Sequence, residues 1–147
     1  MAGQSRNYGG GSHQRQQYTP SLDVSKVVFS GDLEPELFSS VAEQTARTIA
    51  SGKNTNKSTQ LRKFYDEICM WETRISSHPE MFKESLPFIK MINAKVAYAK
   101  GRKLVDDNYV LLINHCLKQI QDEDTMRYFK LFMEAFMGFY KVERPRD

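Results

Sequence analysis

The sequence predicts an all-α protein, a compact bundle of about five helices with a flexible N-terminal tail. From about residue 32 onward, apolar residues recur every three or four positions, as they do on one face of a helix. No segment alternates apolar and polar residues as a strand would. The first 20 residues are rich in Gly, Gln and Ser and have no apolar periodicity. We therefore expect a disordered tail over residues 1–31 and one helical domain over residues 32–147.

The first two expected helices have recognisable ends. Pro35 suits a first helical turn because its φ is fixed and its N–H is missing, and Gly52 would stop that helix. A polar, positively charged loop follows, and either Ser58 or Thr59 can cap the second helix. Pro79 closes this helix. Its apolar stripe consists of Leu61, Phe64, Ile68, Trp71 and Ile75.

Three further helices follow. The third carries an apolar stripe from Leu86 to Ala99 and runs up to Gly101, with Pro87 in its first turn, where proline is tolerated. Val110, Ile113, Leu117 and Ile120 mark the fourth. The fifth, from about 124 to 142, is apolar over more than half of its circumference. This width predicts either the central element of the bundle or half of a subunit interface.

The sequence contains no arrangement typical of an active site. His115 and Cys116 are neighbours on a helix, where adjacent side chains point about 100° apart and cannot act as a base and nucleophile pair. No glycine-rich phosphate loop leads into a helix. Cys69 and Cys116 form no CxxC motif and have no histidine at ligand spacing, so we expect two reduced thiols. The expectation is a protein that is not an enzyme and holds no cofactor and no metal.

The expected location is cytoplasmic. Charged residues interrupt every apolar run long before the roughly 20 residues that a membrane-spanning helix needs. The first residues lack the apolar segment of a secretory signal.

Charge is sorted into blocks along the chain, although the net charge is only +3. Residues 51–63, the first basic segment, contain four Lys or Arg and no acid. Residues 85–103, the second basic segment, contain five and no acid. One acidic block, residues 64–84, separates them. A fold that brings the two segments together would have one positive face.

Part of the second basic segment forms a row on one helical face. Met91, Lys95, Tyr98 and Arg102 fall at i, i+4, i+7 and i+11. Lysine and arginine neutralise phosphates, and a tyrosine ring can stack on a base or ribose. The alternative is a solvated helix face, with Tyr98 closing the edge of the core. The candidate RNA-binding residues are Lys53, Lys57, Arg62, Lys63, Lys95, Tyr98, Lys100 and Arg102.

Three helical segments resemble a known family. TQLRKFYDEI at 59–68, FIKMINAKVAYAKGRK at 88–103 and FKLFMEAFMGFYK at 129–141 are similar, in order and approximate spacing, to the Csm small-subunit family of type III-A CRISPR effector complexes. The resemblance covers about residues 35–141. The residues before 32 have no counterpart in it.

The resemblance implies a non-catalytic subunit of a ribonucleoprotein in antiviral defence. Such a subunit stacks in several copies along the complex and holds the backbone of crRNA and target RNA. Its other partners would be the backbone subunit, which cleaves target RNA, the large Cas subunit and neighbouring copies of itself. Carried over to this chain, one set of phosphate contacts is Lys53, Arg62 and Lys63. A second set is Lys95, Tyr98 and Arg102.

One alternative remains open. The chain could be a helical assembly protein whose wide fifth helix joins protomers and whose acidic and basic blocks pair, without any contact to RNA. A helix-turn-helix DNA binder is disfavoured, because no short helix and tight turn precede an exposed recognition helix.

Overall fold

The computed structural model describes residues 21–147, and residues 1–20, most of the predicted tail, lie outside this range. The described residues form helices and no strands, which confirms the predicted all-α bundle. None of these helices is both long enough and apolar enough for a bilayer crossing. In order, the elements are η1 (Leu37–Val41, a π-helical turn), α1 (Ala42–Ala50), α2 (Ser58–Ser77), η2 (Pro79–Met81, a 3₁₀ turn), α3 (Phe82–Lys90), α4 (Ile92–Gly101), α5 (Asp107–Lys118) and α6 (Glu123–Glu143).

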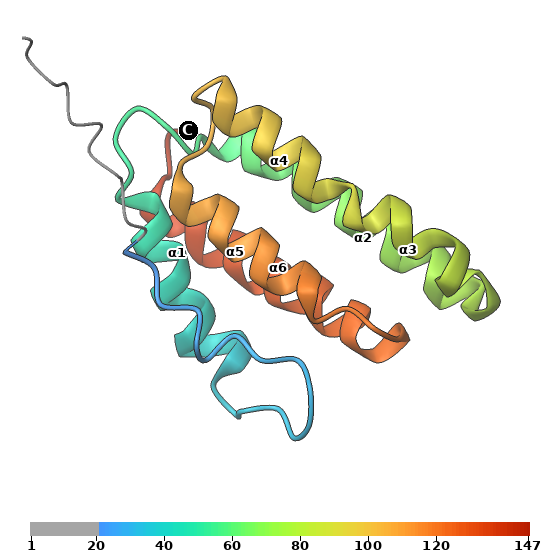
Figure 1. Cartoon of the computed structure of the whole chain (residues 1–147). Coiled ribbons are helices and arrows are strands. Elements are labelled where there is room, and N and C mark those ends of the chain that lie inside the picture. Colours follow the sequence, from blue (N-terminus) through green and yellow to red (C-terminus); the bar gives the residue numbers. More distant parts are fainter. Residues whose placement is uncertain (1–20) are drawn as a thin grey trace, which may run out of the picture.

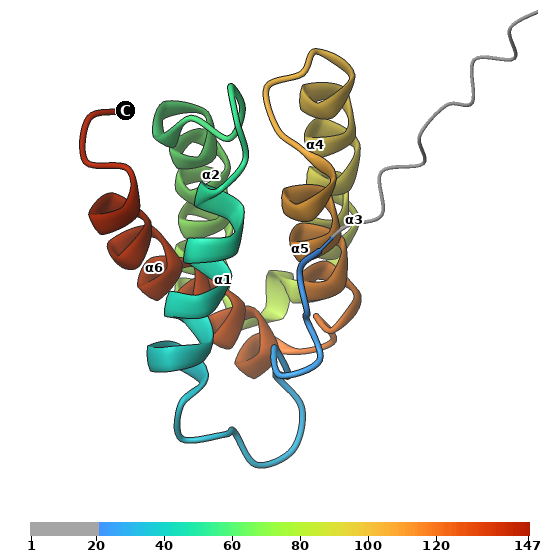
Figure 2. The same ribbon diagram turned by 90° about the vertical axis from the view of Figure 1, so that its left-hand side faces the viewer.

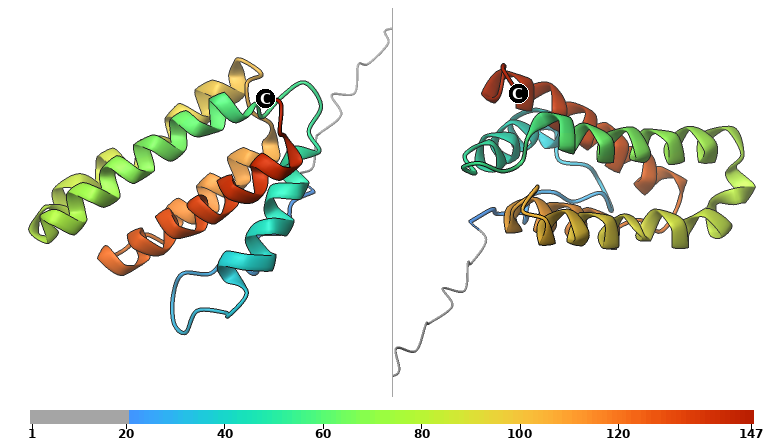
Figure 3. Two further views of the ribbon diagram at one scale, coloured as in Figure 1. Left: turned by 180° about the vertical axis from the view of Figure 1, so that it is seen from behind. Right: turned by 90° about the horizontal axis from the view of Figure 1, so that it is seen from above.

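Four rods make up the body of the bundle: α2, the end-to-end pair α3 and α4, α5, and α6 (Figure 1). Helix α6 packs against α2, and α4 packs against α5. Helix α1 lies on α6, as the end-on view shows (Figure 2). The loop after α1 and the turn after α4 lie at the same end of the bundle (Figure 3).

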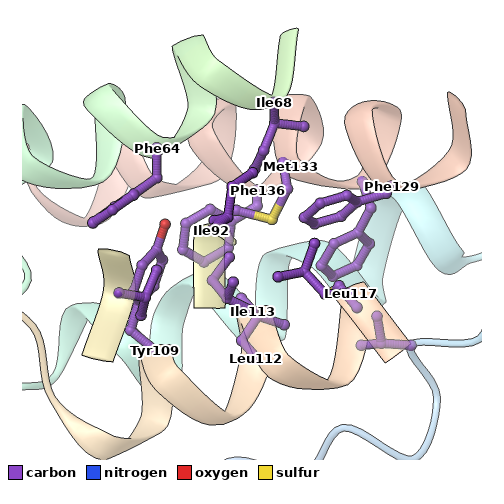
Figure 4. Close-up of a cluster of buried hydrophobic side chains, with 14 of the residues drawn as sticks. Phe64, Ile68, Ile92, Tyr109, Leu112, Ile113, Leu117, Phe129, Met133 and Phe136 are labelled. Atoms are coloured by element: carbon purple, nitrogen blue, oxygen red, sulfur yellow. The ribbon is translucent and has the colours of Figure 1, made fainter. Parts of the chain in front are cut away.

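The core lies between these rods, and α6 is its central element. Figure 4 shows side chains from α2, α4, α5 and α6 meeting in one cluster. Along α6, Phe129, Phe132, Met133, Phe136 and Tyr140 are completely buried, and Val142 is its one exposed large apolar residue. Contact within the chain therefore explains the buried part of the wide apolar stripe, whereas Tyr128, Leu131 and Phe139 are only partly buried.

The predicted third helix is divided. Helices α3 and α4 meet at Met91, whose carbonyl accepts the Ala94 N–H at 3.0 Å in a three-residue step that interrupts the α pattern. The prediction that Pro87 lies in a first turn is wrong. The helix begins earlier, at Phe82, so Pro87 is interior and the backbone loses one hydrogen bond there.

The predicted tail extends too far. Val27 and Phe29 are each 1% exposed, so residues 21–31 belong to the packed structure. Their backbone is held by α5 and the residue that follows it: His115 Nε2 lies 2.7 Å from the Val27 carbonyl oxygen, and the Phe29 N–H donates to Oε1 of Gln119, the C-cap of α5, at 2.8 Å. Because this segment is irregular, it has no helical period by which to recognise it. The packed domain therefore begins by residue 21.

Neither predicted cap of α2 acts as one. The N-cap residue is Lys57, which offers no side-chain acceptor, and Ser58 is already the first helical residue. By contrast, α6 has a capping box: Asp122 Oδ1 accepts the Thr125 N–H at 2.8 Å, and Thr125 Oγ1 accepts the Asp122 N–H at 3.1 Å.

The α6 cap provides a test of stability. Asp122→Ala is expected to lower the free energy of unfolding by about 1 kcal/mol at neutral pH, because it leaves the Thr125 N–H without a partner. Asp122→Asn is the matched control and should cost less, since asparagine also caps. Urea denaturation of the three proteins measures both values.

The same cap predicts a pH dependence. Hydrogen bonds from Thr125 lower the pKa of Asp122 below its ordinary value of 3.8. The cap therefore stabilises the protein fully above pH 3.8, and this contribution is lost as the pH falls through the lower pKa of the folded state. The difference between wild type and Asp122→Ala should shrink below pH 3.8. A difference that stays constant on acidification would contradict the assignment.

Candidate nucleic-acid interface

A buried asparagine joins the loop after α1 to the turn after α4. The Asn56 side chain donates to the Ile49 carbonyl at 3.1 Å and accepts the Asp106 N–H at 2.9 Å. Its own N–H donates to the Leu104 carbonyl at 3.0 Å. Tyr140 donates its hydroxyl to the Asn56 carbonyl, and burial raises the pKa of Tyr140 to about 12, so that this hydroxyl keeps its proton at neutral pH. These bonds fix the end of α1 against the start of α5.

Gly52 permits the close approach of these two segments. A Cβ atom at this position would lie 2.7 Å from Asp106 Oδ2, closer than side chains allow. Asp106 cannot easily retreat, because its other oxygen caps α5 by accepting the Tyr109 N–H at 3.1 Å. The glycine expected to stop the first helix thus has a second role, in long-range packing.

A hollow of about 950 Å³ lies where the two segments meet. It is lined by Lys53 from the first basic segment and by Lys100 and Lys103 from the second. All three lysines are exposed. Asp106 and Asp107 also line it, so the hollow is polar and carries both signs of charge. We call it the lysine hollow; it is the place where the fold brings the two basic segments together.

Left-handed backbone is concentrated around the lysine hollow. Asn54 and Asn56 each have φ 56° and Lys103 has φ 62°, and these are the non-glycine residues with positive φ in residues 21–147. Asparagine tolerates this region, whereas lysine is strained there by about 1 kcal/mol or more. Such strain is often found at functional sites. Lys103 is not among the contacts predicted from the sequence. The feature that could have indicated it is a lysine just after a helix, at a position where glycine is usual.

Three of the predicted contacts are already engaged by carboxylates of the same chain. Lys95 pairs with Glu67 across from α4 to α2, and Lys100 pairs with Asp107. Within α2, Arg62 Nε lies 3.5 Å from Asp66 Oδ1. Exposed pairs of this kind contribute at most about 1 kcal/mol. They nevertheless reduce the positive charge that these residues present to a polyanion.

The remaining predicted contacts are unengaged. Lys53, Lys57, Lys63 and Arg102 are exposed and form no ion pair with any residue of 21–147. Tyr98 is 68% exposed, so it does not close the edge of the core. The Arg102 guanidinium lies 5.9 Å from the centre of the Tyr98 ring. A cation and an aromatic ring thus stand together in solvent near the end of α4.

Lys90, also in the second basic segment, is part of the fold. Its amine donates to the Leu117 carbonyl near the end of α5, and burial lowers the pKa of Lys90. Its charge therefore stabilises the C-terminal turn of α5. It does not add to the positive charge that the other cations of this segment expose to solvent.

The described residues contain no group of three or more His, Cys, Asp or Glu side chains placed to hold a metal ion. Cys69 and Cys116 are free thiols. Complete burial of Cys116 raises the pKa of its thiol well above the ordinary range.

The comparison with known families gives one match. The family model described as Csm2 Type III-A matches residues 32–146, which include every helix named above. No curated protein and no solved structure matches the chain. The match confirms the resemblance seen in the three helical segments. The chain belongs to the Csm2 family, the structural small subunits of type III-A CRISPR effector complexes.

Proposed function

We propose that this subunit binds the sugar–phosphate backbone of the crRNA and target RNA duplex through the lysine hollow and the other exposed basic residues of the two basic segments. The observation that supports this most directly is that Lys53, Lys100 and Lys103 line one hollow although they come from segments about 50 residues apart. Lysine amines neutralise phosphates through charge without reading bases. A complex that must accept any guide sequence requires contacts of this kind.

Different residues contribute differently to this surface. Lys53, Lys57, Lys63 and Lys103 offer unengaged amines, and Arg102 and Tyr98 offer a cation beside an exposed ring that can stack on a base or ribose. Arg62, Lys95 and Lys100 contribute after releasing their carboxylate partners. The free amines therefore dominate binding, and the paired residues have smaller effects.

Family membership implies association with the other Csm subunits. Within the complex, several copies of this chain stack beside the backbone subunit and the large Cas subunit, and they position the RNA duplex without cleaving it. The function is antiviral defence in the cytoplasm. The fully buried residues of α6, such as Phe129, Phe132 and Phe136, are not accessible for contact between copies.

The test removes two unengaged amines from the hollow. Lys53→Ala/Lys103→Ala is expected to weaken binding of a crRNA annealed to its target RNA about tenfold near physiological salt, because two phosphate contacts are lost. The slope of log affinity against log salt should fall by about two. Fluorescence anisotropy with the full chain measures both, for two unrelated guide sequences.

A matched double variant controls for the loss of charge alone. Lys83→Ala/Lys118→Ala removes the same charge from α3 and the end of α5, at the other end of the bundle (Figure 1). It should change affinity less than twofold. Equal losses in the two double variants, or a loss that depends on guide sequence, would overturn the proposal. Unchanged RNA binding together with failed assembly of the complex would favour the assembly alternative.

A further inference from the structure

The lysine hollow contains two carboxylates, which a surface that bound phosphate alone would not need. Asp106 and Asp107 line the hollow together with Lys53, Lys100 and Lys103. A carboxylate repels a phosphate, so each of the two lowers the affinity of the hollow for a polyanion. Phosphate binding by the lysines therefore leaves the acidic residues unexplained.

The two carboxylates differ in their partners. Asp107 pairs with Lys100, so its charge is compensated within the chain. Asp106 forms no ion pair with any residue of 21–147. Its Oδ1 atom caps α5 by accepting the Tyr109 N–H at 3.1 Å, whereas its Oδ2 atom accepts no hydrogen bond from these residues. Asp106 Oδ2 is therefore an acceptor for which the described part of the chain supplies no donor.

The fold holds Asp106 Oδ2 in place and leaves it uncovered. The cap on α5 fixes the carboxylate, and the Asp106 N–H donates to the Asn56 side chain at 2.9 Å. Gly52, which also lines the hollow, lies directly beside Oδ2, since a Cβ atom at position 52 would be only 2.7 Å away. Because glycine has no side chain, nothing at this position covers the oxygen. Asp106 is only partly buried.

The ribose 2′-hydroxyl is the group of an RNA backbone that matches this acceptor. A carboxylate accepts hydrogen bonds and donates none, so its partner must carry a donor. Phosphate oxygens and the ring oxygen of the sugar are acceptors, whereas the 2′-hydroxyl also donates, and DNA lacks it. The hollow thus offers lysine amines to the phosphates and one carboxylate oxygen to the sugar between them.

We propose that Asp106 Oδ2 accepts a hydrogen bond from a ribose 2′-hydroxyl of the RNA held in the lysine hollow, so that the hollow selects RNA over DNA without reading bases. This inference rests on the proposed function, because the lysines must hold the backbone before Asp106 can reach a sugar. The repulsion between Asp106 and the phosphates is offset only when the 2′-hydroxyl is present. The carboxylate therefore acts as a specificity-determining group.

A duplex with 2′-fluoro sugars tests the inference, because fluorine preserves the A-form helix but cannot donate a hydrogen bond. Wild type is expected to bind the crRNA and target RNA duplex about tenfold more tightly than a duplex of the same sequence with fluorine at every 2′ position. This is the effect of one hydrogen bond to a charged group. Fluorescence anisotropy with the full chain measures both affinities. Equal affinities of wild type for the two duplexes would overturn the proposal.

A serine substitution assigns this preference to Asp106. Asp106→Ser removes Oδ2 but keeps the helix cap, because serine also caps helices. The preference for the unmodified duplex should fall below twofold, and the affinity for the 2′-fluoro duplex should rise, because a repelling charge is gone. Asp122→Ser is the matched control: it makes the same change at the N-cap of α6, outside the hollow, and should keep the wild-type preference. An unchanged preference in Asp106→Ser, or an equal loss in both variants, would contradict the role of Asp106.

The lysine variants distinguish failure of this inference from failure of the proposed function. If Lys53→Ala/Lys103→Ala binds both duplexes as tightly as wild type, the hollow does not hold RNA, and both proposals fail. If the double variant binds less tightly but wild type does not distinguish the two duplexes, only the contact with the sugar fails.

Discussion

Replacing Phe29 with alanine is expected to lower the free energy of unfolding by about 3–5 kcal/mol. Phe29 is 1% exposed, and its ring centre lies 6.2 Å from that of Phe129 and 6.1 Å from that of Phe132. Removing the ring leaves a cavity against α6, which the surrounding helices cannot fully close. Chemical denaturation monitored by circular dichroism measures the loss.

Val28 is the natural control for Phe29, because it is the next residue in the same segment and is 41% exposed. Val28→Ala should cost less than about 0.5 kcal/mol. Similar small effects in both variants would mean that residues 21–31 do not belong to the cooperative core.

Asn56→Ala is expected to lower the free energy of unfolding by about 2–4 kcal/mol and to weaken RNA binding as well. The substitution leaves the Ile49 carbonyl and the Asp106 N–H without their partners in a buried site. Once this connection is lost, Lys53 and Lys103 are no longer held around one hollow. Denaturation measures the first effect, and anisotropy at a temperature where the variant is folded measures the second.

Asn54→Ala is the control that distinguishes the effect of losing buried hydrogen bonds from the effect of placing alanine in a left-handed backbone conformation. Asn54 has the same φ of 56° as Asn56, but its side chain is exposed. Asn54→Ala should therefore cost only about 1 kcal/mol, the strain of alanine in the left-handed region. Equal costs at the two positions would show that the Asn56 hydrogen bonds contribute little.

The helices that the sequence predicted best are those with an unbroken apolar period. Leu61, Phe64 and Ile68 mark the buried face of α2 and are buried in the structure, and the stripe along α6 is equally clear. The spacing of apolar residues predicts which residues are buried, because the buried face of a helix recurs every 3.6 residues. The sequence does not reveal the break at Met91, because the apolar spacing of α3 continues into α4.

The candidate site was harder to predict, because contacts distant in sequence determine it. The two basic segments were visible as runs of charge, but nothing local indicated that Asn56 would connect them. The pairing of Lys95 with Glu67, 28 residues apart, likewise depends on α2 and α4 being neighbours. The sequence does not distinguish residues 21–31 from a tail, because an irregular segment packs through single side chains such as Phe29, which create no period.

The connection through Asn56 is made of uncharged groups only: an amide side chain, backbone peptides and a protonated phenol. Ionic strength screens charges, but it has little effect on neutral hydrogen bonds within a protein interior. Concentrated salt should consequently strip bound polyanions from the surface while the scaffold beneath keeps its shape. Elution of the subunit from RNA by salt would then be fully reversible on dilution, without any refolding step.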